Sequence, residues 1–273
     1  MEALISYFSD LEKRPLERAG FFIAGMVLLW IVENTIPLLD THYKKSKSRH
    51  AAINISFTAI HFIIHTLLAG GIILIADWTQ KNNFGLIHLG NFSPLVIILI
   101  TCFVLDFFAG WLCHFVEHQV PVLWRFHIIH HADNNVDVTT GLRHHPLESV
   151  WRGVFFYIGI FASGAPMYAV LLYQTLLVFM TGFTHANISL PRRLDKILSW
   201  ILISPNMHKV HHHWKQPFTD SNYGAVFSIW DRMLGTFSKL EPKNIQYGLD
   251  KYYPNEKDED FKALMIRPFQ KLK

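Results

Sequence analysis

Two copies of the motif HxxHH flank one long apolar segment, and this arrangement restricts the possible topologies of the chain. The copies occupy residues 127–131 and 208–212, and the residues between 150 and 184 are almost entirely apolar. If that segment crossed a membrane once, the two copies would emerge on opposite sides and could not form one site. Two crossings place them on the same side, and a Ser-Gly-Ala-Pro sequence at 163–166 supplies a turn in the middle. Because the segment is slightly short for two full crossings, it predicts a tight or tilted helical hairpin.

The histidines within each copy have helical spacing. Positions i, i+3 and i+4 lie on one face of a helix, so each copy presents several imidazoles to one point. A related pair, His114 and His118, precedes the first copy at i, i+4. With 17 histidines in 273 residues, chance explains two such triplets poorly, and packing alone does not require this spacing. We interpret the three elements as a metal site, and because imidazole suits Zn, Cu, Fe and Ni, ligand type alone does not select the metal.

The number of candidate ligands indicates two metal ions rather than one. The candidates are His114, His118, His127, His130, His131, His208, His211 and His212, with His185 as a ninth. Four ligands saturate a structural zinc ion. Soluble di-iron bundles use Glu-x-x-His and zinc proteases use His-Glu-x-x-His, but this sequence contains neither motif. We therefore expect an all-histidine dinuclear centre at a membrane face.

Hydropathy predicts an all-α, polytopic membrane bundle of three spans plus the hairpin. Charged residues make up 17% of the chain, against about 25% in soluble domains. The spans are predicted at residues 19–39, 51–78 and 92–113, each close to the length that crosses the hydrocarbon. The basic residues of the first loop are Lys44, Lys45, Lys47 and Arg49. Under the positive-inside rule that loop is cytoplasmic, which predicts a cytoplasmic face for the site and for the histidine-rich cap after residue 184.

The chain is expected to form a single membrane domain over residues 1–273. Its parts are the N-terminal spans, the histidine-box region and a tail, at residues 1–90, 91–240 and 241–273. Residues 1–18 predict a short interfacial helix, and the N-terminus lacks the pattern of a signal peptide. The cysteines, Cys102 and Cys113, both lie in an apolar stretch, so no disulfide framework or CxxC zinc site is indicated.

The order of these motifs resembles the fatty acid hydroxylase superfamily, also called the sterol desaturase family. That order is HxxxH, a gap of eight residues, HxxHH, and a second HxxHH after a hairpin. Further similarities are Trp124-Arg-Phe-His127, Arg143-His-His-Pro-Leu-Glu148, Thr184-His-Ala-Asn187, Asn222-Tyr-Gly224 and Trp230-Asp-Arg-Met-Leu-Gly-Thr236. The resemblance covers about residues 106–236, whereas residues 1–90 match only as apolar spans.

The resemblance implies a non-haem di-iron site that activates O2 and oxidises a C–H bond of a lipid or sterol-like substrate. It implies two iron ions as cofactor, O2 as co-substrate and His185 as a ligand. Branches of the family hydroxylate, desaturate or repeatedly oxidise a methyl group, and the boxes do not distinguish these outcomes. Such enzymes need external electrons. No GxGxxG fingerprint or haem domain fits this sequence, so a separate ferredoxin or cytochrome b5 with its reductase is expected at the cap.

Several residues outside the boxes are candidates to support the ligands. Metal-bound imidazoles usually donate their other N–H to a carboxylate or a carbonyl, and the candidate carboxylates are Glu117, Asp133, Asp137, Glu148 and Asp231. His145 could be a ligand, a supporting donor or a purely structural residue. For His185 the alternative to ligation is a residue that complements a helix dipole.

Among the polar residues within the predicted spans, Glu33, His61, His65 and Asp106 require an explanation. His61 and His65 are spaced i, i+4, but we expect a hydrogen-bonded pair or a pocket lining rather than ligands. Glu33 should face protein or lie near the interface, and Asp106 should be paired, with Arg125 or water as its partner. His213 lies off the face of the second triplet and is expected to be solvated.

Two other classes of function compete with an oxygenase. A membrane protein that transports or stores a divalent metal would place ligands along a path through the bilayer, whereas these triplets gather at one face. A di-zinc lipid hydrolase would share the ligands, but the sequence lacks a serine nucleophile elbow. The basic pI does not indicate nucleic-acid binding, since the sequence has no stripe of basic residues on a soluble fold. The tryptophans and Arg192, Arg193 and Lys196 instead suggest anchoring at a membrane interface.

Overall fold

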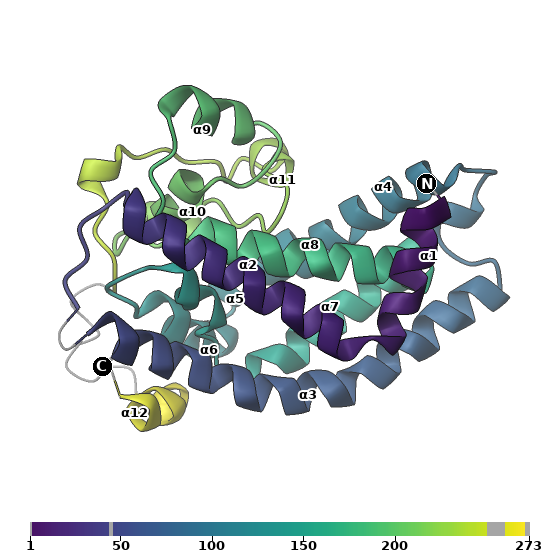
Figure 1. Cartoon of the computed structure of the whole chain (residues 1–273), viewed down its shortest axis with the longest axis horizontal. Helices are drawn as coiled ribbons and strands as arrows, with labels where there is room; N and C mark the ends of the chain where they lie inside the picture. Colours follow the sequence, from purple (N-terminus) through teal and green to yellow (C-terminus); the bar gives the residue numbers. More distant parts are fainter. Residues whose placement is uncertain (1, 44–45, 250–259, 271–273) are drawn as a thin grey trace.

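The computed structural model describes residues 2–43, 46–249 and 260–270 and confirms the predicted all-α class. Within that part of the chain the regular elements are helices, and β-pairing is limited to isolated bridges. The long helices run side by side along the long axis of the molecule (Figure 1). They are α2 (Pro15–Thr35), α3 (Lys47–Lys81), α4 (Pro94–Leu105), α7 (Glu148–Ser163) and α8 (Met167–His185).

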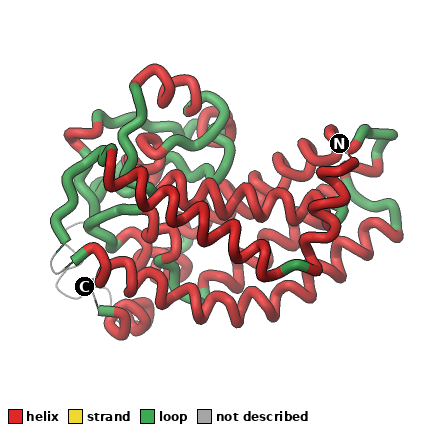
Figure 2. The backbone as a smooth tube through the Cα atoms, in the orientation of Figure 1, coloured by secondary structure: helices red, strands yellow, loops and turns green. Residues whose placement is uncertain are grey.

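Short helices and loops gather at one end of this bundle and form the predicted cap (Figure 2). The cap contains α5 (Cys113–Gln119), α6 (Pro121–His131), η4 (Val138–Leu142), α9 (Arg192–Leu198), α10 (Pro205–His211), η5 (Phe218–Asp220), α11 (Ile229–Met233) and η6 (Pro242–Asn244). The chain ends with α12 (Phe261–Ile266) and η8 (Arg267–Phe269), while α1 (Glu2–Asp10), η1 (Leu11–Lys13) and η2 (Leu86–His88) lie at the other end of the bundle (Figure 1).

Three helical segments are long and apolar enough to cross a membrane: Lys47–His88, Pro94–Gln119 and Met167–His185. The first contains the predicted span 51–78, the second contains all but the first two residues of the predicted span 92–113, and the third is the second arm of the hairpin. The predicted span 19–39 corresponds to α2, which ends at Thr35 and is not among these three segments. Only 6% of the most apolar window of Lys47–His88 is buried, as expected for side chains that face lipid. Lys44 and Lys45 of the basic loop lie outside the described residues.

The predicted hairpin is present, and its turn lies at the predicted place. Helix α7 ends at Ser163, Gly164 adopts a left-handed conformation with φ of +72°, and α8 begins at Met167. At 1.5 Å per residue the arms are about 24 and 28 Å long, just under the hydrocarbon thickness of about 30 Å. A Cβ added to Gly164 would lie 2.2 Å from the carbonyl oxygen of Phe84, so this turn packs directly on the loop after α3. Both HxxHH motifs consequently lie at the other end, in the cap.

The core of the bundle is packed between α3, α4, α7 and α8. Its buried side chains include Ile98, Leu105, Ile160, Val170 and Tyr173. A second cluster lies beneath the first HxxHH motif, where Ile128 and Ile129 of α6 pack on Phe57 of α3 and Leu264 of α12. The apolar residues between the histidines of that motif therefore fix the helix that carries them.

Helices α4 and α5 are joined without a break by a π-helix, η3 (Asp106–Leu112). Asp106 begins this segment and is fully buried. Its carboxylate accepts hydrogen bonds from the amides of Val226 and Phe227 at 3.0 Å each, from Trp230 Nε1 at 3.0 Å and from the hydroxyl of Tyr173 at 3.2 Å. The expectation that Asp106 is paired is right, but the suggested partner Arg125 is wrong, because Arg125 donates instead to the carbonyl of Pro268 at 2.6 Å.

Glu33 ties the end of α2 to the cap. It is buried and accepts hydrogen bonds from the amides of Val138 at 2.9 Å and Asn187 at 3.0 Å, and Lys47 Nζ lies 2.6 Å from its carboxylate. The expectation that Glu33 faces protein is therefore confirmed. Asp106 and Glu33 act as anchors that hold irregular cap segments against the ends of the long helices.

Candidate metal centre

Four helices bring the nine candidate histidines to one place in the cap. Helix α5 carries His114 and His118, α6 carries the first HxxHH motif near its C-terminus, α8 ends at His185, and α10 carries His208 and His211 with His212 at its C-cap. Proline at the first turn starts α6 and α10, and the Ser204 hydroxyl caps α10 by accepting from the amide of Met207 at 3.2 Å. Each motif thus lies on a short helix with a well-defined start.

The nine histidines separate into two adjoining clusters. The five-histidine cluster consists of His114, His118, His127, His131 and His211, and the four-histidine cluster consists of His130, His185, His208 and His212. Within each cluster, one ring nitrogen from every member lies within 4.8 Å of the others. The clusters are neighbours, since the ring centroids of His131 and His212 are 4.8 Å apart.

The two HxxHH motifs contribute to the clusters in opposite ways. In the first motif the i and i+4 histidines, His127 and His131, belong to the five-histidine cluster, and the i+3 histidine belongs to the other. In the second motif His208 and His212 belong to the four-histidine cluster, and His211 crosses to the other. Each triplet therefore contributes to both clusters: the histidines at i and i+4 face one cluster, and the histidine at i+3 faces the other. This division explains why both motifs have three histidines rather than two.

Hydrogen bonds from outside the clusters orient the rings. The Nδ1–H groups of His114, His211 and His185 donate to the backbone carbonyls of Tyr223, Ser221 and Thr181 at 2.9, 2.7 and 2.7 Å. His118 Nδ1 lies 3.1 Å from Asp220 Oδ1, and His127 Nδ1 lies 3.0 Å from Glu148 Oε1. Because carbonyls and carboxylates only accept, these five rings carry their proton on Nδ1 and direct the Nε2 lone pair inward.

The inward nitrogens of neighbouring rings lie close to one another. Nε2 of His114 is 3.1 Å from Nε2 of His127, and Nε2 of His185 is 3.0 and 2.9 Å from those of His130 and His208. In the first pair both nitrogens present lone pairs, so they repel each other unless a positive ion lies between them. Further buried Nε2 atoms have no hydrogen-bond partner among the described residues, namely those of His118, His131, His211 and His212. Both observations fit rings arranged around metal ions.

Burial favours the neutral form of the nine cluster imidazoles, which is the form that binds metal. Desolvation lowers the pKa of His127 to about 3, despite the opposing effect of Glu148. Burial, reinforced by neighbouring histidines, also holds the pKa values of His131 and His212 well below the usual range. At neutral pH these rings can therefore bind metal without first losing a proton.

A buried ionic network lies beside the five-histidine cluster. Glu148 accepts from Arg152 Nε at 2.8 Å and lies 2.8 Å from His144 Nδ1, in addition to its contact with His127. Arg152 also pairs with Glu117, which accepts from Trp151 Nε1 at 2.7 Å. His127, His144 and Glu148 form a further group with metal-ligand spacing. We regard it as support for His127, because Arg152 occupies the carboxylates.

The predicted supporting residues differ in how they relate to the clusters. Glu117 lies 3.7 Å from His127 Nδ1, beyond hydrogen-bond distance. Asp231 touches no cluster histidine, but it accepts from the amide of Tyr223 at 2.8 Å, and the carbonyl of Tyr223 orients His114. His145 points away from the site: its Nε2 lies 3.2 Å from the carbonyl of Met265, and its Nδ1 accepts from the amide of Leu147. Of the three roles left open for His145, its contacts fit the purely structural one, and it neither joins a cluster nor supports a cluster histidine through a hydrogen bond.

Two other candidate carboxylates, Asp133 and Asp137, hold the neighbouring loop instead. Both lie against His50, at 2.9 and 3.1 Å, and Asp133 also accepts from the Thr140 hydroxyl at 2.7 Å. The Tyr43 hydroxyl donates to Asp137 at 2.8 Å. They fix the start of α3 against the segment between α6 and η4.

Three residues near the clusters were missed by the motif search. Asp220 is the last residue of the short helix η5. His144 belongs to the HPLE-like segment, and its ring stacks on His130 at 4.2 Å. Lys209 is fully buried and donates to the carbonyls of His185 at 3.1 Å and Ala186 at 2.5 Å, so it holds the end of α8. Of these three residues, only Lys209 could have been identified from the sequence. It lies between two candidate histidine ligands, and a lysine buried there is costly without a partner.

Three further histidines that the sequence analysis separated from the candidate ligands are His61, His65 and His213. His61 is hydrogen-bonded to the Ser149 hydroxyl at 2.6 Å and, through Nε2, to the carbonyl of His144 at 2.9 Å, and His65 Nε2 lies 3.4 Å from the same hydroxyl. Both are outside the clusters, as expected. His213 is also outside them, but the prediction that it is solvated is wrong: it is buried and accepts from the amide of Gln246 at 3.1 Å.

The chain belongs to the fatty acid hydroxylase family. The family model "Fatty acid hydroxylase" matches residues 99–236, which extend from within α4 to just past α11 and contain all nine candidate histidines. This match confirms the family that the order of the histidine boxes suggested.

Among curated proteins, the chain resembles several named as lipid or sterol oxidoreductases. It is 33% identical over 168 residues to alkylglycerol monooxygenase from Xenopus tropicalis, covering 62% of this chain and 36% of that protein. It is 27% identical over 180 residues to ornithine lipid hydroxylase OlsE from Rhizobium tropici, covering 65% and 52%. Lathosterol oxidase from Homo sapiens is 27% identical over 218 residues, covering 80% and 70%. The matched region spans about a third to a half of the first two relatives, and no solved structure matches the chain.

Proposed function

We propose that this protein is a membrane-bound, non-haem di-iron oxygenase that hydroxylates or desaturates a C–H bond of a lipid or sterol-like substrate with O2. The observation that carries this proposal is the division of nine histidines into two adjoining clusters. The five-histidine cluster would hold one iron ion and the four-histidine cluster the other. Two bound irons would supply the activation of O2 and the oxidation of an unactivated C–H bond.

The protein residues are suited to hold and isolate such a centre. Donation from Nδ1 to Tyr223, Ser221, Thr181, Asp220 and Glu148 fixes the direction of five ligands before any metal binds. Such outer contacts preorganise the ligands and raise their basicity. The cluster side chains are buried, which excludes bulk water and limits side reactions at a reactive centre.

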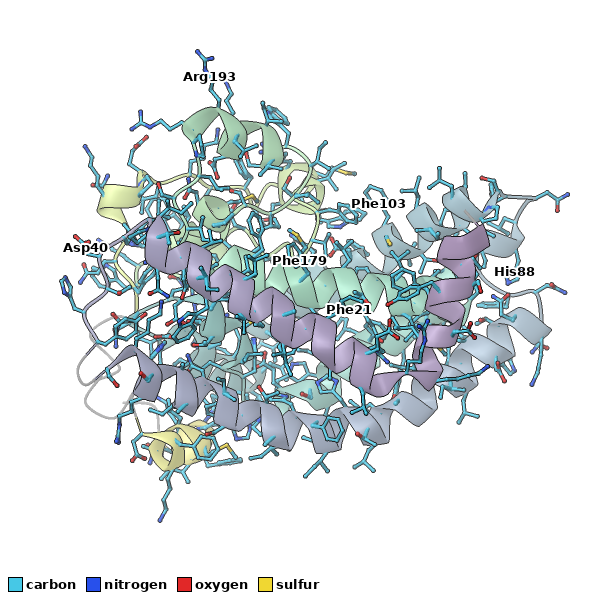
Figure 3. All side chains as sticks on the ribbon, viewed as in Figure 1. Phe21, Asp40, His88, Phe103, Phe179 and Arg193 are labelled. Carbon is cyan, nitrogen blue, oxygen red and sulfur yellow. The ribbon has the colours of Figure 1, made fainter. Side chains whose placement is uncertain are left out.

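The position of the site at one end of the bundle favours a lipid substrate. Figure 3 places Asp40 and His88, which flank α3, at opposite ends of the molecule, and the clusters lie at the end of Asp40. A lipid chain could reach that end from within the bilayer. The relatives named for alkylglycerol, ornithine lipid and lathosterol oxidation supply the panel of substrates to test.

The positive-inside rule assigns this end to the cytoplasmic side, because Lys47 and Arg49 begin α3 there. We propose that a ferredoxin or a cytochrome b5 with its reductase delivers the electrons at this face of the cap.

Metal analysis of adjacent histidine variants tests the proposed ligands. We expect about two iron ions per chain in the purified protein, with His212→Ala losing iron and turnover and His213→Ala retaining both. The two residues are neighbours and both buried, but only His212 belongs to a cluster. One tightly held zinc ion with no iron, or equal iron in the two variants, would contradict the proposal.

The reaction itself can be tested by comparing lipidomes with and without the gene, and with His212→Ala. We expect lipids that gain one oxygen or lose two hydrogens, dependent on O2. Product formation that persists without O2 would instead indicate a hydrolase.

Metal transport is less well supported by the arrangement of polar groups. The candidate ligands gather at one end, and three of the polar residues singled out in the predicted spans have partners: Glu33 with Lys47, His61 with Ser149, and Asp106 with Trp230. Metal flux in proteoliposomes without O2 consumption would favour transport.

A further inference from the structure

One exposed apolar surface on the cap is formed by α9, the segment after it, and α11. We call it the α9–α11 flange and define it by Leu194, Ile197, Trp200, Ile201, Ile229, Met233 and Leu234, all classed as exposed. Four of these large side chains, Ile197, Trp200, Ile201 and Met233, are between 61% and 68% exposed. A contiguous apolar surface of this kind usually marks an interaction site.

The flange is held together as one unit. The amide of Ser228 donates to the carbonyl of Ile201 at 3.1 Å, and the Ser228 hydroxyl donates to the carbonyl of Ser199 at 2.8 Å. Arg232 donates to the same carbonyl at 2.6 Å, and its guanidinium lies 4.2 Å from the centre of the Trp200 ring. The apolar side chains therefore project from a fixed base rather than from a loose loop.

The flange is continuous with a candidate membrane span. Trp230 of α11 lies 5.1 Å from the ring of Phe107 and 6.0 Å from that of Phe103, and Phe103 stacks on Phe227 at 4.5 Å. Phe103 and Phe107 belong to the segment Pro94–Gln119. If that segment crosses the bilayer, α11 lies where the span leaves the hydrocarbon, and the flange extends sideways from it.

The exposed residues of α9 carry a positive charge next to the apolar side chains. Arg192, Arg193 and Lys196 are opposed on this helix only by Asp195, and Figure 3 shows Arg193 pointing away from the body of the molecule. Arg192 lies 4.0 Å from Glu241, but both side chains are largely exposed, so the pair screens the charge weakly. Apolar and aromatic residues bordered by arginine and lysine are typical of helices that lie in a membrane interface.

We propose that the α9–α11 flange is inserted into the membrane leaflet on the side of the metal centre, with Arg192, Arg193 and Lys196 on anionic headgroups. The occupant of this surface is the lipid leaflet, not a second protein. The bundle is thereby held at a fixed depth by its spans and by the flange. This inference requires only that the bundle spans a membrane, and it does not depend on the proposed reaction.

Fluorescence quenching by lipids in nanodiscs tests the depth of the flange. Ile197→Cys and, as a matched control, Lys243→Cys on an exposed part of the cap would each carry an environment-sensitive fluorophore, since Cys102 and Cys113 are buried. We expect lipids with a doxyl group just below the headgroup to remove most of the emission at Ile197 and little at Lys243. If Ile197→Cys fails to fold, Met233→Cys carries the same test.

The composition of the nanodisc tests the charged border. We expect phosphatidylserine in phosphatidylcholine discs to increase quenching at Ile197, and replacement of Arg192, Arg193 and Lys196 by glutamine to abolish that increase. Equal, weak quenching at positions 197 and 243 would overturn the proposal, as would discs with two copies of the chain that shield Ile197 from lipid. Strong quenching without any effect of phosphatidylserine would overturn the role of the basic residues.

Discussion

At the scale of single residues, the site is defined by which nitrogen of each imidazole faces inward. Five rings direct Nδ1 to a carbonyl or carboxylate, which leaves Nε2 for the interior of a cluster. Three of these acceptors are backbone carbonyls, of Tyr223, Ser221 and Thr181. The orientation of the ligands therefore depends on how well the loops of the cap are held, as well as on the ligands themselves.

Asp220 allows the orienting contacts to be tested without a large effect on folding. Its side chain is 31% exposed and lies 3.1 Å from His118 Nδ1. We expect Asp220→Asn to weaken metal binding about 10- to 100-fold, the range found when partners of ligating histidines are removed. Titration with a metal chelator measures this change. Gln216→Ala removes the other partner of Asp220 and should leave the affinity unchanged, and an equal loss in both variants would argue against a role for Asp220.

The depressed pKa values predict how the stability of the metal-free protein depends on pH. The folded pKa of His127 is about 3 because of burial, against about 6.5 in an unfolded chain. Between these values the unfolded state binds more protons, so stability falls as the pH is lowered from about 6.5 towards about 3. Thermal unfolding in detergent after metal removal measures this slope. His131→Asn removes one such group and should make the slope shallower, and an unchanged slope would contradict the explanation.

At the scale of helices and loops, two buried carboxylates join irregular segments of the cap to the long helices. Glu33 binds two amides of the cap, and Asp106 binds two amides and two side chains. The hydrogen bonds to each carboxylate compensate for burying its negative charge, which would otherwise be costly within or near a bilayer. These contacts attach the cap, and with it α10, to the bundle.

The contribution of Asp106 can be measured by removing its carboxylate. Asp106→Ala leaves two buried amides and the Trp230 indole without an acceptor, at about 1–3 kcal/mol each. We expect a clear loss of thermal stability in detergent and faster proteolysis between α10 and α11. Ser163→Ala is the control, since the Ser163 hydroxyl bonds only within its own helix. Similar melting temperatures for the two variants would show that Asp106 is not an anchor.

Periodic features of the fold and site could be predicted from the sequence, whereas contacts between irregular segments could not. The spacing of the histidines and the glycine–proline turn are local signals, and they predict the hairpin and the collection of nine histidines at one end. Three of the partners of Asp106 are 120 to 124 residues away along the chain. Asp220 lies in a single short turn of helix, and Tyr223 lies in the loop after it, so neither is marked by a periodic pattern. The division into two clusters depends on how α6 and α10 face each other, which no single motif specifies.

At the scale of the whole molecule, the two ends of the bundle differ in chemistry. One end holds the cap, and at the other end lie α1 and the connections between the long helices (Figures 1 and 2). If the bundle spans a membrane, these ends lie on opposite sides. The two histidine clusters, which lie in the cap, would then be on one side of that membrane.

Labelling of introduced cysteines from each side of a membrane tests this polarity. Lys81 at the end of α3 is 76% exposed, and Lys243 lies on the cap. We expect an impermeant maleimide to label Lys81→Cys and Lys243→Cys from opposite sides of sealed vesicles, with Lys243→Cys facing the cytoplasm. Labelling of both from the same side would contradict the arrangement, and the unchanged chain, whose cysteines are buried, supplies the background.

The π-helix between α4 and α5 determines the rotational phase of the first two ligands. A π turn closes over five residues rather than four, and each residue of an α-helix turns the chain by about 100°. The extra residue therefore changes the direction in which side chains point after the π-helix. Apolar residues of α4 face the bundle, while His114 and His118 of α5 face the other members of the five-histidine cluster. An insertion or deletion within Asp106–Leu112 would rotate these two imidazoles away from the cluster, although all nine candidate histidines would remain in the sequence. For this chain, we therefore expect a change of length in this short segment to weaken metal binding even when all nine candidate histidines are kept.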